Sequence, residues 1–215
     1  KTSGRESITA KLTANLLEKS GVDRVLAMDL HSAQIQGYFD IPCDHIYGSP
    51  VLIDYLETLD LEEIVVVSPD VGGVARARAF AKLMNDAPLA IIDKRRSAHN
   101  IAESLTVIGE VKGKTAILID DMIDTGGTIC SGANLLKKEG ANRIFACASH
   151  AVFSPPSYER LSSKNLFEQV IVTNSIPVIH KDNFPQLKVL SVANMLGEAI
   201  WLSLIHISEP TRQWS

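Results

Sequence analysis

Two adjacent acids followed by a glycine-rich turn are the residues of this chain best suited to chemistry. They follow the apolar run 116–119 and lead into the turn DTGGT at 124–128. Neighbouring carboxylates can accept hydrogen bonds from the vicinal hydroxyls of a ribose. Glycines let a phosphate approach the main chain, and threonine hydroxyls add donors. The stretch predicts a sugar-phosphate site that binds ribose 5-phosphate through Asp120, Asp121, Asp124, Thr125, Gly126, Gly127 and Thr128.

The residues around this site predict how it is positioned. The run 116–119 is short, apolar and uninterrupted, which is typical of a strand buried on both faces of a parallel sheet. Ligands of such sheets bind outside the carboxyl ends of the strands. We expect the turn to open a helix that runs to about Glu139 and ends at Gly140 in a left-handed conformation. The alternative is an ordinary turn between a strand and a helix, with no ligand.

Other phosphate-binding motifs are absent from the sequence. Neither GxxxxGK[ST] nor GxGxxG occurs anywhere in the chain. This disfavours ATPases of the P-loop type and Rossmann dehydrogenases.

The whole chain alternates between apolar runs and helical patterns. Further strands are predicted at 25–28, 64–67, 89–92, 144–148 and 170–172, and helices at 8–19, 50–59, 74–85 and 193–201. Alternation of this kind predicts an α/β fold, in which helices cover both faces of a parallel sheet.

Composition favours a cytoplasmic enzyme with small ligands. The chain has 215 residues, 46% of them hydrophobic, and a formal charge of −4. No apolar run approaches the roughly 20 residues that span a bilayer, so we expect no membrane partner. The cysteines show no metal-ligand spacing and are expected to be reduced thiols. We expect no nucleic-acid partner, because no basic block extends beyond Arg95 and Arg96.

Longer motifs give the chain a family resemblance. The string DDMIDTGGT resembles the 5-phosphoribosyl 1-diphosphate (PRPP) motif of the type I phosphoribosyltransferase fold. Together with MDLHSAQIQGYFDIPCDH at 28–45, VVVSPDVGGVARARAFAKLMND at 65–86 and IIDKRR at 91–96, it resembles the ribose-phosphate diphosphokinase family from Lys1 to about Trp201.

The resemblance implies an activity and an assembly. Enzymes of this family transfer the diphosphoryl group of Mg-ATP to the anomeric hydroxyl of ribose 5-phosphate. The products are PRPP, which feeds nucleotide biosynthesis, and AMP. The family also implies a homo-oligomer, commonly a hexamer.

The resemblance also assigns catalytic and binding residues. Lys94 and Arg96 match the family's catalytic loop, where cations stabilise the charge that develops during phosphoryl transfer; the alternative for such a run is a solvated loop. Arg76 and Arg78 contribute either to this site or to a solvated helix face, and their spacing sends the two side chains in different directions. The implied diphosphate loop contains Asp70, Gly72 and Gly73, and the implied Mg²⁺ positions are His31, Asp70 and Asp29.

The family is built from two tandem domains. Residues 1–45 would be the end of the amino-terminal domain, and 46–201 the carboxyl-terminal domain. Residues 202–215 depart from the family and resemble translated adapter sequence, so we expect a tail without helical continuation beyond Trp201. Because the adenine pocket draws on the missing half of the first domain, we expect this chain to bind ribose 5-phosphate but to turn over poorly.

Two other functions stay open. A phosphoribosyltransferase that consumes PRPP shares DDMIDTGGT, but MDLH, Lys94 and Arg96 argue against it. A non-catalytic subunit associated with the synthetase is disfavoured by the intact acids and cations.

Overall fold

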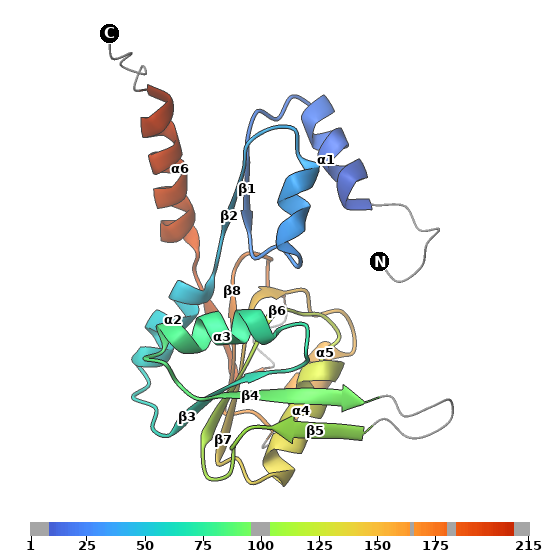
Figure 1. Ribbon diagram of the computed structural model, residues 1–215, viewed down its shortest axis with the longest axis vertical. Coiled ribbons are helices and arrows are strands. Elements are labelled where there is room, and N and C mark those ends of the chain that lie inside the picture. Colours follow the sequence, from blue (N-terminus) through green and yellow to red (C-terminus); the bar gives the residue numbers. More distant parts are fainter. Residues whose placement is uncertain (1–8, 96–103, 164–165, 180–183, 209–215) are drawn as a thin grey trace. The chain divides into compact units, whose positions relative to one another are not determined.

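The computed structural model describes residues 9–95, 104–163, 166–179 and 184–208. They belong to two compact units, Lys1–Pro50 and Val51–Ser215. Figure 1 shows the helices and strands of each unit. None of the described helices is long and apolar enough to cross a membrane.

The first unit is a small two-stranded sheet with helices. Its elements are helix α1 (Thr9–Lys19), strand β1 (Val25–Met28), the 3₁₀ helix η1 (Ala33–Tyr38) and strand β2 (Cys43–Ile46). The strands pair in parallel, with Val25 opposite Cys43. Every residue of both strands is only partly buried. The first helix and first strand lie where the sequence predicts them.

The second unit is built on a seven-stranded sheet in the order β5-β4-β3-β6-β7-β8-β9. Its strands are β3 (Ile64–Ser68), β4 (Leu89–Arg95), β5 (Ser104–Ile108), β6 (Thr115–Ile123), β7 (Arg143–Ala151), β8 (Gln169–Thr173) and β9 (Leu187–Leu190). All neighbouring pairs are parallel except β4 and β5, which are antiparallel.

Helices cover both faces of this sheet, as predicted. Helices α2 (Ser49–Glu57) and α3 (Val74–Leu83) contribute to the core on one face, and α4 (Gly127–Lys138) and α5 (Ser157–Leu161) to the core on the other. The last helix is α6 (Ala193–Ser208). Alternate residues of β6 enter two different cores because strand side chains alternate between faces. Leu118 packs in the core that contains α4 and α5 residues, and Ile117 in the core that contains α2 and α3 residues. The strand that precedes the candidate site is therefore held from both sides.

Three expectations about the elements are corrected. The sheet is not wholly parallel, because β5 adds an antiparallel edge strand. Strands β2, β5 and β9, the 3₁₀ helix η1 and the short helix α5 were not predicted. The expected end of the last helix at Trp201 is wrong, since α6 continues to Ser208. Apolar residues continue beyond Trp201. The first proline after it is Pro210, and the residue before a proline disfavours the helical conformation.

Candidate active site

The order of the strands brings both predicted ligand loops to one edge of the sheet. From β3 the chain continues outward to β4 and β5, and from β6 it continues outward in the opposite direction to β7, β8 and β9. Strands β3 and β6 are parallel neighbours, so the connections diverge at their carboxyl ends. Ligands of open α/β sheets bind at such a switch point. The loop at 69–73 follows β3 there, and the turn at 124–128 follows β6.

The turn after β6 forms a cavity of about 250 Å³. Strand β6 extends to Ile123, four residues beyond the predicted run, so both acids lie inside the strand. Helix α4 begins at Gly127, and Gly126 before it is left-handed, with φ of 73°. Gly140 is left-handed after the helix, as predicted. The cavity is lined by Asp120, Met122, Ile123, Asp124, Thr125, Gly126, Gly127, Thr128 and Ile129.

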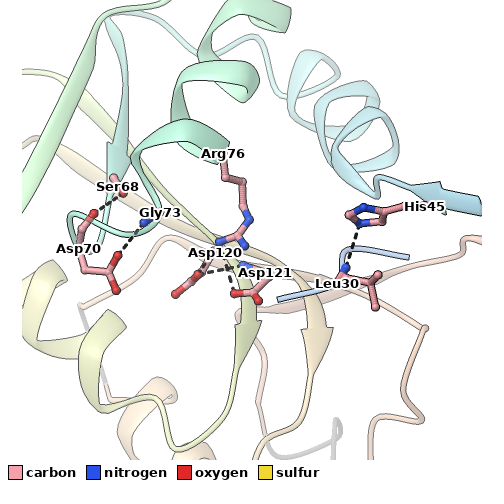
Figure 2. Close-up of polar contacts among 8 residues, drawn as sticks. All are labelled: Leu30, His45, Ser68, Asp70, Gly73, Arg76, Asp120 and Asp121. Atoms are coloured by element: carbon pink, nitrogen blue, oxygen red, sulfur yellow. Dashed lines mark hydrogen bonds and ion pairs between the residues drawn. The ribbon is translucent and has the colours of Figure 1, made fainter. Parts of the chain in front are cut away.

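The two acids of β6 have different surroundings. Asp120 lines the cavity, whereas Asp121, with a side chain only 3% exposed, is not among the lining residues. Arg76 of α3 connects them: its Nη1 lies 3.0 Å from Asp120 Oδ1 and 3.3 Å from Asp121 Oδ1 (Figure 2). The backbone N–H of Asp121 also donates to Asp120 Oδ1, at 2.9 Å. The geometry makes Asp120 the acid that can reach a ligand in the cavity.

Burial changes the acidity of Asp120. It raises the pKa of this carboxyl to about 7; the neighbouring Asp121 adds to the rise, and the positive charge of Arg76 opposes it. Near neutral pH, Asp120 can therefore act as an acceptor or as a donor toward a sugar hydroxyl.

Arg76 and Arg78 do point in different directions, as their spacing predicts. Arg76 is partly buried beside the acids of β6, and Arg78 is exposed. Because Arg76 lies in the first turn of α3, just after the loop at 69–73, it connects that loop to the two acids of β6. The solvated-face alternative therefore holds for Arg78 and fails for Arg76.

The loop after β3 is closed by its own polar contacts. Asp70 Oδ1 accepts the backbone N–H of Gly73 at 2.8 Å, and Ser68 Oγ donates to the carbonyl of Asp70 at 2.7 Å (Figure 2). A β-carbon on Gly73 would lie 3.0 Å from Ser68 Oγ, and one on Gly72 would lie 3.3 Å from Asp70 Oδ1. The glycines keep the loop tight where α3 begins, and helix starts of this kind favour anions.

The other predicted metal residues belong to the first unit. Asp29 is buried, and its Oδ2 accepts the backbone N–H of Gly48 at 2.7 Å. His31 is exposed. Between them, the N–H of Leu30 donates to His45 Nε2 at 3.0 Å (Figure 2). The turn that carries both predicted residues is thus held to the segment 45–48 by hydrogen bonds between side chains and backbone N–H groups.

No protein cage for a metal ion is present in the described part of the chain. The described residues contain no group of three or more His, Cys, Asp or Glu side chains that could hold an ion. Mg²⁺ commonly binds one or two carboxylates together with substrate phosphates and water. Single carboxylates such as Asp70 fit an ion of that kind, held mainly by the phosphates of a nucleotide.

Of the two predicted catalytic cations, Lys94 lies near the end of β4. This strand continues to Arg95 rather than ending at Ile92, because residues 91–95 pair with β5. Lys94 is opposite Leu105 in that pairing, and its side chain is exposed. Arg96 lies outside the described residues.

One cation beside the cavity was missed in the sequence. Arg160 of α5 donates from Nη1 to the carbonyl oxygen of Thr125, at 3.0 Å. The segment around it, PSYERL, carries no motif, and 35 residues separate the partners. Nothing local in the sequence indicates this contact.

A known protein family matches the carboxyl-terminal part of the chain. The model of the phosphoribosyl synthetase-associated domain matches residues 94–211, more than half of the chain. The chain belongs to this family. The expected family boundary at Trp201 stays a prediction, since the matched range extends beyond it.

Two curated relatives are similar in sequence to almost all of this chain. A ribose-phosphate pyrophosphokinase of Prochlorococcus marinus subsp. pastoris is 95% identical over 201 residues, which are 94% of this chain and 61% of the relative. Ribose-phosphate pyrophosphokinase 1 of Spinacia oleracea is 66% identical, covering 94% of this chain and 60% of the relative. The chain therefore spans about three fifths of the length of these relatives.

A solved structure has the same fold. Phosphoribosylpyrophosphate synthetase from Mycobacterium smegmatis aligns with a TM-score of 0.87 and 44% identity, over 94% of this chain and 66% of that one. The predicted α/β fold of the synthetase type is confirmed.

Proposed function

We propose that the full-length protein is a ribose-phosphate diphosphokinase. It transfers the diphosphoryl group of Mg-ATP to the anomeric hydroxyl of ribose 5-phosphate and releases PRPP and AMP. The observation that carries the proposal is the position of Arg76, which joins the loop after β3 to the acids of β6. A diphosphate loop and a sugar-phosphate loop that meet at one switch point suit a reaction between these two groups. The names of the relatives support the same activity.

The residues of the cavity would hold the acceptor. Asp120 accepts hydrogen bonds from ribose hydroxyls, while the N–H groups at the start of α4 and the hydroxyls of Thr125 and Thr128 bind the 5′-phosphate. Such binding fixes the anomeric oxygen relative to the loop after β3. Positioning of this kind lowers the entropic part of the barrier.

The remaining residues would control charge. The anomeric oxygen would bond to the β-phosphorus, the bond from that phosphorus to the α-phosphate oxygen would break and release AMP, and the proton of the attacking hydroxyl would pass to solvent. When bound with ATP, Mg²⁺ would supply neutralisation of part of the phosphate charge. The loop of Asp70, Gly72 and Gly73 would orient the transferred group. The family resemblance assigns Asp29, His31 and Asp70 to the binding of Mg²⁺. Lys94 and Arg96 would stabilise charge on the leaving and equatorial oxygens.

We also propose that residues 1–45 complete an amino-terminal domain and that 46–201 form the second. Strands β1 and β2 lack any fully buried residue, and helix α1 exposes Leu12 and Leu16 by 56% and 63%. Apolar surface of this kind suits burial against further chain. The full-length protein would act in the cytoplasm as a homo-oligomer, commonly a hexamer in this family. Light scattering of full-length protein should then report a mass of several subunits, and a monomer would contradict the assembly.

The decisive test is AMP formation by the full-length protein. With Mg-ATP and ribose 5-phosphate, AMP release that depends on the sugar phosphate supports the proposal, and Lys94→Ala should remove most of it. PRPP consumption with a free base would instead favour a phosphoribosyltransferase. A folded protein with neither activity would favour a non-catalytic partner subunit. The 215-residue chain should bind ribose 5-phosphate and release little AMP.

A further inference from the structure

A phosphate bound in the cavity would add negative charge beside two acidic side chains. In the described part of the chain, its lining includes the acids Asp120 and Asp124 and no lysine or arginine. A phosphate monoester is close to a dianion at neutral pH. The start of α4 offers only about half a positive charge through the helix dipole. A cation from outside the lining would balance the site.

Helix α5 brings such a cation to the rim of the cavity. Leu161 is buried, and its side-chain atoms lie 3.4 to 3.8 Å from the position of a β-carbon on Gly126. This contact fixes α5 against the left-handed residue before α4. From the preceding position, Arg160 donates from Nη1 to the carbonyl of Thr125 at 3.0 Å. The guanidinium is therefore anchored to the turn that the phosphate would enter.

The guanidinium also lies near the first residue of α4. Its Nη1 is 3.5 Å from the position that a β-carbon on Gly127 would occupy. The first N–H groups of a helix have no partner within the helix and are available to an anion. The charge of Arg160 is felt one turn further on: burial raises the pKa of the Cys130 thiol to about 11, and Arg160 opposes that rise.

We propose that Arg160 binds the phosphate group of the sugar phosphate and thereby contributes to the selection of ribose 5-phosphate over unphosphorylated sugars. This proposal rests on the proposed function. Only one N–H of the guanidinium is needed for Thr125, and the rest of the planar fork can bind phosphate oxygens. Arg160 thus adds a full charge where the helix start supplies a partial one.

A role in supporting the turn alone makes different predictions. If Arg160 only held the carbonyl of Thr125, its loss would lower stability and weaken every ligand of the cavity alike. A phosphate-binding role predicts weaker binding of phosphate-bearing ligands, a shallower dependence of affinity on ionic strength, and partial rescue by lysine.

The test is calorimetric titration of the 215-residue chain with ribose 5-phosphate and with inorganic phosphate, at low and high salt. The variants are Arg160→Gln and Arg160→Lys, with Arg143→Gln as the matched control. Arg143 is the first residue of β7, so it lies at the amino end of that strand, away from the cavity at the carboxyl end of β6. It pairs with Glu168 at 3.2 Å. We expect Arg160→Gln to weaken ribose 5-phosphate binding by about tenfold or more, Arg160→Lys to weaken it less, and Arg143→Gln to leave it unchanged.

The outcomes distinguish the role of Arg160 from the proposed function. If the wild-type chain binds ribose 5-phosphate and Arg160→Gln binds it equally well, the role of Arg160 is refuted and the proposed function stands. Equal affinity losses in the glutamine and lysine variants, with a lowered melting temperature and an unchanged salt dependence, would indicate a supporting role and also refute it. If the wild-type chain does not bind ribose 5-phosphate at all, this inference is refuted, while the diphosphokinase activity is decided separately by AMP formation in the full-length protein.

Discussion

Replacing Asp120 with asparagine removes a partly buried carboxyl group while preserving its shape. Burial raises the pKa of this carboxyl from 3.8 to about 7. A group whose pKa is raised on folding contributes stability that is complete below its unfolded pKa and is lost as the pH rises through its folded pKa. We therefore expect the wild-type chain to lose stability between about pH 4 and pH 7 through this residue. The amide in Asp120→Asn does not titrate and should not show that loss.

The size of the effect follows from the pKa. A rise from 3.8 to about 7 corresponds to roughly 4 kcal/mol, at about 1.4 kcal/mol per pKa unit. The side chain is 23% exposed, and Arg76 stabilises its charged form at 3.0 Å. We therefore expect Asp120→Asn to exceed the wild type at pH 8 by about 2 to 4 kcal/mol in free energy of unfolding. The same variant should bind ribose 5-phosphate about tenfold more weakly, because a charged acceptor is lost.

The assay is urea unfolding followed by circular dichroism from pH 4 to pH 8, combined with a binding titration at pH 7.5. Asp124→Asn is the control, since it makes the same charge change on an exposed side chain of the same cavity. The loss of stability through Asp120 between about pH 4 and pH 7 should persist in this control. If Asp120→Asn keeps the wild-type slope with pH, or is no more stable at pH 8, the reasoning about burial is wrong.

Other substitutions test the remaining parts of the site and fold. Asp121→Asn should weaken ribose 5-phosphate binding less than Asp120→Asn, because only Asp120 lines the cavity; titration of both variants measures the difference. In the full-length enzyme, Lys94→Ala should lower kcat at least tenfold and change KM for ribose 5-phosphate little; a raised KM with normal kcat would contradict its catalytic role. Gly109→Ala should cost about 2 to 4 kcal/mol of stability, because φ is +117° and a β-carbon would lie 2.9 Å from an atom of β4. Gly113→Ala, also at positive φ but with open space around it, should cost less in the same melting experiment.

Local sequence was a good guide where the physics is local. The turn at 124–128 and the helix stop at Gly140 depend on residues within a few positions, and both lie where they were predicted. The apolar runs marked the strands of the central sheet because burial on both faces requires uninterrupted apolar sequence. They marked the ends of those strands less well. Polar residues interrupt the run at Asp120 although β6 continues, since pairing with β7 holds it to Ile123.

The parts that were missed depend on neighbours. Strand β5 has an ordinary alternating sequence, and it becomes an antiparallel edge only because β4 is long enough to pair with it. The contact of Arg160 with Thr125 spans 35 residues, and that of Arg76 with Asp120 spans 44. Spacing along the chain carries no information about such pairs.

The sequence by itself determined the alternation of strands and helices, the acids and glycines of the two loops, and the resemblance to the ribose-phosphate diphosphokinase family. The tertiary structure alone decided which charged groups lie close together. It placed Arg76 between the two acids, buried Asp120 enough to raise its pKa, and brought Arg160 to the turn at 124–128. The physical reason is that burial and charge pairing depend on which elements pack together, whereas turns, caps and periodicity depend on adjacent residues.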